Sequence, residues 1–433
     1  MESGSSQQWE ELIVSSEING TPAPVFDPQR LTEAMEARGV DGLVITTPLN
    51  VTYLSGHNPT APKADEPPGV AVVISRHDLQ HPVLIGPDIF VSPFLYDPIW
   101  IEDIRPHRSV LLPVGASTDR SEFFRFMPAS RQDSGWVKNA GDRFAGGFTE
   151  AIRDAVQDLG LTHGRIGYDD LRVGAKVAGS LADVVDAYNL MMLVRERKSA
   201  QEIEWLREAT RVNQVAIERT VQSWSRGKHW KDLVDTYHAE ISALGGWVYD
   251  PGGVFFANPL DGDPAVRLRV DSEDFVVQPG TNIMFDCHGT KNQYCWDGGK
   301  TWVVEDYASD MARRIGRATT EAMNEIHDAM RPGVRIGDLQ ERSRRTFQQL
   351  GVPQHDSVLT YFHGLGLSHA DVLALVEDGA DPNWTLEEDM VIAAHLLCPG
   401  DEKERCWIEE VFLVKEGGSE PLFTWGNDPL TNG

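Results

Sequence analysis

The sequence predicts an α+β protein in which an α/β domain precedes a second domain of long helices and antiparallel hairpins. In the first part of the chain, short apolar strands alternate with helical stretches, which is typical of an α/β domain. In the second part, long amphipathic helices are interspersed with pairs of strands joined by polar turns. The length of 433 residues agrees with two or three domains, and a composition of 41% apolar and 24% charged residues excludes disorder for most of the chain.

The charge and the cysteine content exclude several classes of protein. With 39 basic and 66 acidic residues the formal net charge is −27, so nucleic acid and anionic membranes would repel the chain. Four cysteines without a C-x-x-C pair are too few for a disulfide scaffold and exclude a zinc ribbon. The N-terminus does not read as a signal peptide, and no stretch approaches the roughly 18 apolar residues of a membrane span. We therefore expect a cytoplasmic protein.

The N-terminal domain is predicted to span residues 23–190, after a flexible polar tail at 1–22. Its first helix begins near Pro28 and ends at Arg38, because Gly39 stops it. The remaining elements, in order, are a strand at 42–46 that Pro48 breaks, strands at 70–74 and 83–85, an irregular insertion at 113–147, a helix at 148–159 and a strand at 165–168.

The C-terminal domain is predicted to span residues 191–433. A capping box of Ser199 and Glu202 opens its first long helix, whose apolar residues recur at spacings of three and four. A second helix has its apolar face between Met311 and Ile326 and ends at Pro332. The remaining elements are a helix at 336–350, a hairpin formed by 282–288 and 293–304, and a hairpin formed by 390–397 and 406–414.

Acidic residues and histidines interrupt these strands at central positions. Asp286 and His288 lie two residues apart, so they project from the same face of one strand, and Asp297 can reach that face across the hairpin. His395 and Glu409 interrupt the two strands of the second hairpin. A buried carboxylate is costly unless it is paired or binds a metal. The mixed oxygen and nitrogen donors therefore indicate a shared Mn, Fe, Co or Zn ion, the alternative being solvated or ion-paired groups at strand ends.

A glycine-rich segment, His363-Gly-Leu-Gly-Leu-Ser-His369, carries a histidine at each end. Its two glycines let the backbone approach a ligand or a metal closely. One histidine could supply a metal ligand and the other an acid–base group, although many such segments are plain turns. Tyr361, two residues earlier, is a candidate catalytic or pocket-lining residue.

In their order along the chain, these motifs resemble those of the M24 metallopeptidase superfamily, which includes aminopeptidase P, prolidase, methionine aminopeptidase and creatinase. The resemblance covers residues 26–417. Besides the polar strands, it rests on the junction at 194–203, the segment at 26–56 and the turn Arg331-Pro-Gly-Val334. It implies a pita-bread catalytic domain preceded by a creatinase-like α/β N-terminal domain, and a homodimer.

The resemblance also implies which residues bind the metal. The two aspartates of the family match Asp286 and Asp297, eleven residues apart, its histidine matches His363, and its last glutamate matches Glu409. The other glutamate falls on His395, so an imidazole replaces a bridging carboxylate. Three carboxylates cannot balance two divalent ions, which favours one tightly held ion with a weaker second site, and more nitrogen favours Zn, Fe or Co over Mn.

Two further departures separate this chain from the peptidases of the family. Upstream of the first aspartate, peptidases carry a proton-shuttling histidine where this chain has Val266-Arg-Leu-Arg269. Peptidases place a second histidine seven residues after the metal histidine, whereas His369 comes at six. The offset of six resembles the DddP-type dimethylsulfoniopropionate lyases, which place a catalytic Asp there and carry D-x-D where this chain has Asp286-Cys-His288. This likeness implies His369 as the base and His288 as a sixth metal ligand or a catalytic group.

These observations leave four functions open. The first is a metal-dependent hydrolase of a small molecule, in which a metal lowers the pKa of a bound water to about 7 and a histidine moves protons to cleave a C–N or similar bond. The second is a DddP-like lyase that abstracts a proton and eliminates a leaving group. The third is an Xaa-Pro peptidase, and the fourth is a metal-free binding protein. Each of the three enzymes would use one or two divalent transition ions (Fe, Zn, Mn or Co) and a small-molecule substrate, with no nucleic acid or membrane as partner.

Overall fold

The computed structural model describes residues 17–18, 21–58, 69–109, 119–133, 135–177, 183–248, 255–257, 259–260, 274–375, 379–401 and 403–432. The chain folds as two compact units, Met1–Val194 and Arg195–Gly433. Most of the predicted tail at 1–22, and the segment 266–269 that lacks the peptidase histidine, lie outside the described residues. Within the described ranges, no helix is long and apolar enough to cross a membrane.

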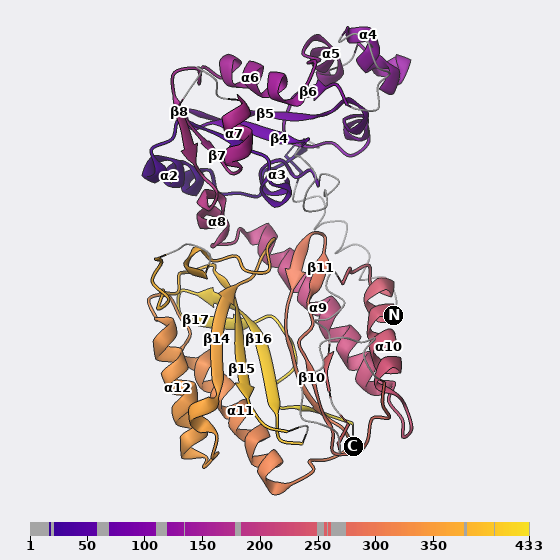
Figure 1. Ribbon diagram of the computed structural model, residues 1–433, viewed down its shortest axis with the longest axis vertical. Helices are drawn as coiled ribbons and strands as arrows, with labels where there is room; N and C mark the ends of the chain where they lie inside the picture. The colour runs from indigo at the N-terminus through magenta and orange to yellow at the C-terminus, as the bar shows by residue number, and fades with distance from the viewer. Residues whose placement is uncertain are drawn as a thin grey trace. The chain divides into compact units, whose positions relative to one another are not determined.

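A six-stranded mixed sheet forms the centre of the N-terminal unit (Figure 1). Its strands, in spatial order, are β6 (Asp103–His107), β5 (Asp78–Pro87), β4 (Ala71–Ser75), β3 (Gly42–Ile45), β7 (Arg165–Tyr168) and β8 (Asp183–Asp186). The helices of this part of the chain are α2 (Pro28–Arg38), α3 (Pro48–Ser55), α4 (Arg120–Phe123), α5 (Gly135–Asp142), α6 (Phe148–Asp158), α7 (Leu171–Val177) and α8 (Leu190–Arg195). A short ladder of β1 (Glu17–Ile18) and β2 (Thr21–Pro22) precedes them. Every residue of the central strand β3 is buried, as expected for a strand covered on both faces.

The first helix and the insertion show where local signals succeed and where they fail. The helix α2 has the predicted bounds, because the Asp27 side chain accepts hydrogen bonds from the first backbone N–H groups and Gly39 ends the helix with φ 66°. The insertion at 113–147, predicted to be irregular, instead contains α4 and α5 within its described part. The reason is that these short segments have apolar side chains that bury in the core, such as Phe123 and Val137.

An eight-stranded sheet forms the centre of the C-terminal unit. In spatial order its main strands are β14 (Leu359–Gly364), β15 (Val391–Cys398), β16 (Cys406–Lys415), β13 (Gly299–Val303), β10 (Asn282–Phe285) and β9 (Phe255–Phe256). β17 (Gly418–Pro421) pairs with β16, and β18 (Leu430–Thr431) pairs with β13. A separate ladder joins β11 (Gly289–Lys291) to β12 (Tyr294–Trp296).

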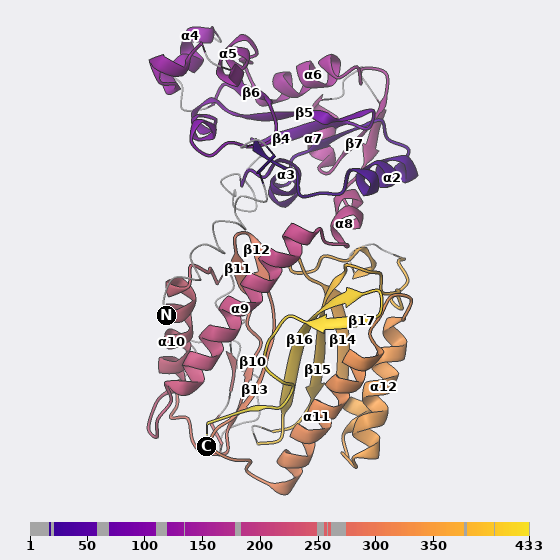
Figure 2. The same cartoon turned by 180° about the vertical axis from the view of Figure 1, so that it is seen from behind.

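Four long helices pack against this sheet in two pairs. They are α9 (Ala200–Gln222), α10 (Trp230–Ala243), α11 (Asp310–Ala329) and α12 (Ile336–Gln349). The apolar faces of α11 and α12 share a core with β14, β15 and β16, whereas those of α9 and α10 share a core with β10 and β13. Figures 1 and 2 show the two pairs toward opposite edges of the sheet. The capping box predicted at Ser199 is present, and α11 ends before Pro332 as predicted.

Both predicted hairpins are confirmed. β15 and β16 pair antiparallel along their whole length. Residues 282–304 form one hairpin with an interrupted ladder, because β10 pairs with β13 and β11 pairs with β12 in the same antiparallel register. The turn lies at Asn292 and Gln293, both of which have positive φ. β10 ends just before Asp286, so Asp286 and His288 lie in the connection to β11 and not on a strand.

Candidate metal centre

Strand pairing places three polar residues in one row across β14, β15 and β16. Tyr361 is opposite His395, and His395 is opposite Glu409. Residues opposite one another project to the same face of a sheet, and so does His363, two residues after Tyr361. Asp297 joins them from the short connection between β12 and β13, because it lies two residues before Gly299, which pairs with Glu409. Residues far apart in the sequence therefore meet at one face.

Four of these side chains converge on one point. Nε2 of His395 lies 2.9 Å from Nε2 of His363 and 2.9 Å from Oε1 of Glu409. Nε2 of His363 lies 3.4 Å from Oδ2 of Asp297 and 3.9 Å from Oε1 of Glu409. One donor atom from each residue falls within 4.8 Å of the others, and all four residues are buried. We call Asp297, His363, His395 and Glu409 the four-ligand cluster.

Hydrogen bonds do not satisfy the polar atoms of the four-ligand cluster. Nδ1 of His363 donates to the carbonyl oxygen of Gly364 at 3.1 Å, which leaves the lone pair of this ring on Nε2. Both carboxylate oxygens of Glu409 and Oδ2 of Asp297 are buried without a hydrogen bond of ordinary geometry to any described residue. Imidazole nitrogens nevertheless lie within 3 Å of two of these atoms, Nε2 of His395 near Oε1 of Glu409 and Nε2 of His369 near Oδ2 of Asp297. Two carboxylates and two neutral imidazoles match the charge and the donor preference of one divalent transition ion. The residues present therefore fit such a metal.

Burial and neighbouring charges shift the pKa values in this cluster in directions that suit metal binding. Burial raises the pKa of Glu409 well above its ordinary value, and the neighbouring aspartates add to this effect. Burial lowers the pKa of both histidines of the cluster, so their imidazoles are neutral and can donate a lone pair. Burial opposes ionisation of Asp297 as well, but the close imidazole of His369 and the nearby histidines hold the pKa of Asp297 below its ordinary value.

Two further histidines lie beside Asp297. Nε2 of His369 is 2.7 Å from Oδ2 of Asp297, and the His369 side chain is 46% exposed, so this ring touches both the cluster and solvent. The ring of His288 meets the ring of His369 edge to face, with centroids 5.5 Å apart. The predicted catalytic histidines are therefore brought together at the open side of the site.

Tyr361 and Asp286 border the four-ligand cluster without joining it. The Tyr361 ring stacks on His395 with ring centroids 3.9 Å apart, and burial raises the pKa of its hydroxyl, so the phenol is protonated. Asp286 interacts with Glu409. Among the described residues, however, its carboxylate is not in either group of donor atoms that gathers within 4.8 Å. The structure thus places Tyr361 as a wall of the site and Asp286 as a neighbour of Glu409.

A chain of hydrogen bonds from α9 and α10 positions Asp297. Oη of Tyr237 donates to Asn213 at 2.8 Å, and Nδ2 of Asn213 donates to the carbonyl oxygen of Gly298 at 2.9 Å. The N–H of Gly298 in turn donates to Oδ1 of Asp297. Gly298 has φ +90°, and a Cβ atom there would lie 2.6 Å from the carbonyl oxygen of Glu409. Because only glycine fits, this position sets the approach of Asp297 to Glu409.

Gly298→Ala is expected to destabilise the C-terminal unit and to weaken metal binding. The methyl group would push against Glu409 and would require a disfavoured backbone conformation, which together cost about 2–5 kcal/mol. Gly333→Ala is the matched control, because Gly333 has φ +86° and no atom within 4 Å of its Cβ position. The control should cost only the backbone term of about 1–2 kcal/mol. Urea unfolding and metal analysis measure both effects, and equal behaviour of the two variants would contradict the steric role.

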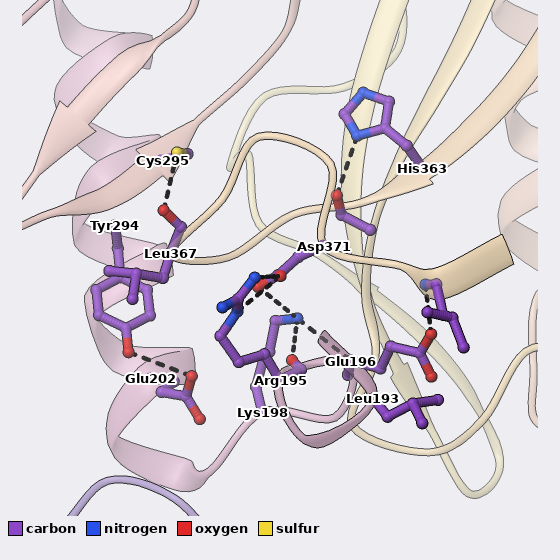
Figure 3. Close-up of polar contacts among 12 residues, drawn as sticks. Leu193, Arg195, Glu196, Lys198, Glu202, Tyr294, Cys295, His363, Leu367 and Asp371 are labelled. Carbon is purple, nitrogen blue, oxygen red and sulfur yellow. Dashed lines mark hydrogen bonds and ion pairs between the residues drawn. The ribbon is translucent and has the colours of Figure 1, made fainter. Parts of the chain in front are cut away.

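A buried ion cluster anchors the loop that follows His363, as Figure 3 shows. Nε of Arg195 donates to Oδ1 of Asp371 at 2.9 Å, and Nζ of Lys198 lies 3.7 Å from Oδ2. The backbone N–H of Asp371 donates across the loop to the residue after His363. The three charged side chains are at most 5% exposed. We call Arg195, Lys198 and Asp371 the Asp371 clamp, which holds the loop that carries His369.

The sequence pattern does not reveal these supporting residues. Asn213 and Tyr237 lie on the buried faces of their helices, where the apolar periodicity predicts only packing. Arg195 and Lys198 belong to the junction at 194–203, and Asp371 follows the histidine-rich segment by two residues. The opposite charges of the junction and of Asp371 are the signal in the sequence that points to the clamp.

Comparison with known proteins identifies the family of this chain. The family model of metallopeptidase family M24 matches residues 204–416, and that of the creatinase/prolidase N-terminal domain matches residues 28–191. An uncharacterised peptidase of Staphylococcus saprophyticus is 24% identical over 405 residues, which cover 91% of this chain and 98% of that protein. Dimethylsulfoniopropionate lyase DddP of Roseovarius nubinhibens is 30% identical over 147 residues, 32% of each protein.

Solved structures show the same fold. The X-Pro aminopeptidase of Thermotoga maritima has a TM-score of 0.69 and 17% identity, covering 92% of this chain and 100% of that one. The Xaa-Pro dipeptidase of Bacillus anthracis has a TM-score of 0.67 and 16% identity, covering 94% and 99%. These likenesses confirm the predicted pita-bread domain and its creatinase-like N-terminal domain. The chain therefore belongs to the M24 metallopeptidase family and is a metal-dependent enzyme of that family.

Proposed function

We propose that this chain is a metal-dependent hydrolase that cleaves a C–N bond in a small molecule. The observation that carries the proposal is the buried four-ligand cluster with the half-exposed His369 in contact with its Asp297. This arrangement places a metal centre beside an acid–base group that solvent and a substrate can reach.

The four-ligand cluster would hold the metal. A divalent ion bound there supplies a Lewis acid and brings the pKa of water near 7. Two imidazoles among four ligands favour Zn, Fe or Co over Mn. The protein keeps bulk water away from these ligands, because all four residues are buried and Tyr361 stacks on His395.

His369 is the residue that we assign to proton transfer. Asp297 orients its ring through the 2.7 Å contact at Nε2, and His288 packs against the ring edge to face. In hydrolysis the ring accepts a proton from the attacking water and returns it to the leaving nitrogen, while a C–O bond forms and the C–N bond breaks. Tyr361 stays protonated and lines the site, where its hydroxyl can donate a hydrogen bond to substrate.

The position of His369 favours a substrate other than an ordinary Xaa-Pro peptide. This histidine follows His363 by six residues, and the resemblance to family peptidases implies seven. Since proton transfer depends on the position of the acid–base group, the shift changes which leaving group it can reach. The solved relatives that are named for X-Pro substrates share the fold at only 16–17% identity, so Xaa-Pro peptides are one arm of the test below.

A lyase is the second candidate, because DddP of Roseovarius nubinhibens is 30% identical over 147 residues of this chain. In that reaction His369 would take a proton from the carbon next to the substrate carboxylate. The C–H electrons would form the C=C bond of acrylate, and the C–S electrons would leave with dimethyl sulfide. No water is consumed, so the two candidates differ in the mass of their products.

Turnover of a small panel by metal-loaded protein tests the proposal. The panel contains Xaa-Pro and other dipeptides, N-acyl amino acids, guanidino acids and dimethylsulfoniopropionate, with products identified by mass spectrometry. We expect uptake of one water and release of an amine, lost on metal removal and reduced about 10²–10⁴-fold in His369→Gln. The control is His355→Gln, which changes a histidine on the short helix at 355–357. Metal-dependent release of dimethyl sulfide would favour the lyase, and a protein that binds no metal would exclude both.

A homodimer belongs to the same proposal and rests on the family resemblance. Sedimentation equilibrium tests the oligomeric state, because a dimer has about twice the chain mass of 48.1 kDa. A monomer at micromolar concentration would contradict this part and leave the chemistry untouched.

A further inference from the structure

A second group of donor atoms lies beside the four-ligand cluster. It consists of His288, Asp297 and His369, whose donor atoms lie within 4.8 Å of one another. Oδ2 of Asp297 is 2.7 Å from Nε2 of His369, and the two imidazole rings have centroids 5.5 Å apart. Three side chains with metal-ligating chemistry thus share one small region at the open side of the site.

Asp297 belongs to both groups. Its Oδ1 atom accepts a hydrogen bond from the N–H of Gly298, which leaves Oδ2 for ligands. Oδ2 is buried without a hydrogen bond of ordinary geometry to any described residue. It lies 3.4 Å from Nε2 of His363 on one side and 2.7 Å from Nε2 of His369 on the other. A buried carboxylate oxygen between two sets of imidazoles is suited to bridge two cations.

We propose that His288, Asp297 and His369 form a second cation site, which we call the outer site. The proposal rests on the proposed function only in that Asp297 must also belong to the four-ligand cluster. Two imidazoles and one carboxylate select Zn²⁺, Co²⁺ or another ion that binds nitrogen, and disfavour Mg²⁺ and Ca²⁺. The family resemblance would instead assign Asp286 to a second ion, but that residue is in neither donor group.

The outer site binds its ion more weakly than the four-ligand cluster and exchanges it with solvent. His369 is 46% exposed and His288 is half-buried, whereas all four residues of the cluster are buried. The outer site also has one shared carboxylate, so less negative charge faces the second ion. Its occupation has a consequence for catalysis, because Nε2 of His369 cannot hold a metal ion and a proton at the same time. Excess metal therefore removes the acid–base residue and inhibits the enzyme.

Cobalt binding to metal-free full-length protein tests the outer site. Equilibrium dialysis against Co²⁺ alone, with elemental mass spectrometry and visible absorption, counts the ions and reports nitrogen ligation. We expect about two equivalents per chain, with the second bound at least about tenfold more weakly. His288→Ala and His369→Ala should each keep the tight equivalent and weaken the second by at least about tenfold. Asp286→Asn should keep both.

Controls separate the outer site from adventitious binding and from misfolding. His355→Ala removes a histidine that lies outside both donor groups and should bind cobalt as wild type does. Circular dichroism and retention of the tight equivalent show that each variant is folded, and His369→Gln repeats the test with a bulkier side chain. One equivalent at saturation, two equivalents in both histidine variants, or loss of the weak equivalent in Asp286→Asn would overturn the outer site. A wild-type protein without any bound cobalt would instead overturn the proposed function.

Discussion

Replacing Glu409 by glutamine is expected to stabilise the metal-free protein and to abolish tight metal binding. Both oxygens of this carboxylate are buried without a hydrogen bond of ordinary geometry to any described residue. Burial and the charges of Asp297 and Asp286 raise its pKa, which shows that the metal-free fold disfavours the ionised form. A neutral amide of the same shape relieves this cost but offers no charge to a cation. Metal affinity should fall by more than about a hundredfold. About a hundredfold is the largest usual loss when the mutated residue only supports a metal ligand, and Glu409 is itself assigned as a ligand.

Thermal unfolding with and without metal measures both effects. Metal at about 100 times its Kd should add about 2.7 kcal/mol to the unfolding free energy of the wild type. Glu409→Gln should unfold at a higher temperature than metal-free wild type and should gain nothing from metal. An undiminished gain from metal in this variant would remove Glu409 from the ligand set.

Glu410→Gln is the matched control for this experiment. Glu410 is the next residue on β16 and is as buried as Glu409, but it accepts hydrogen bonds from the N–H groups of Val411 and Phe423. Burial raises the pKa of Glu410 to about 8, so the carboxyl is largely neutral at pH 7 and glutamine resembles it. The stabilisation by metal should therefore persist in this variant.

Asp371→Ala is expected to lower the unfolding free energy of the C-terminal unit by about 3–5 kcal/mol, the usual cost of removing one partner of a buried ion pair. The change would leave the guanidinium of Arg195 and the ammonium of Lys198 buried without their acid. Burial lowers the pKa of Lys198, so the loss of the Asp371 charge would further disfavour its protonated form. The loop with His369 would also lose its anchor.

Asp381→Ala is the control for the Asp371 clamp. Asp381 pairs with Arg335 at the surface, where its side chain is 61% exposed, so its loss should cost less than about 1 kcal/mol. Urea unfolding at neutral pH compares the two variants. Equal midpoints would show that the clamp contributes no more than an exposed ion pair, and a stable Asp371→Ala protein with normal metal content would contradict its anchoring role.

The helices with strong local signals are the part of the fold that could be predicted. α2 and α9 begin at side chains that cap their own backbone N–H groups, and α11 ends where proline cannot continue it. The helix α10 and the short helix α3 have no counterpart in the prediction. The hairpin at 282–304 has the predicted partners, but a run of alternating residues does not reveal that its ladder breaks between β10 and β11.

The sequence by itself determined the chemical content of the site, because carboxylates and imidazoles within apolar strands must be paired or bind a metal. From this pattern and the family resemblance came Asp297, His363, His395 and Glu409. Only the tertiary structure decided that these four converge. Strand register places His395 opposite Glu409, and β14 and β13 pair with the outer sides of β15 and β16. It also placed Asp286 beside Glu409 but in neither donor group, and it placed His288 with His369 around Asp297. Strand register depends on contacts between distant segments, and no local residue pattern contains that information.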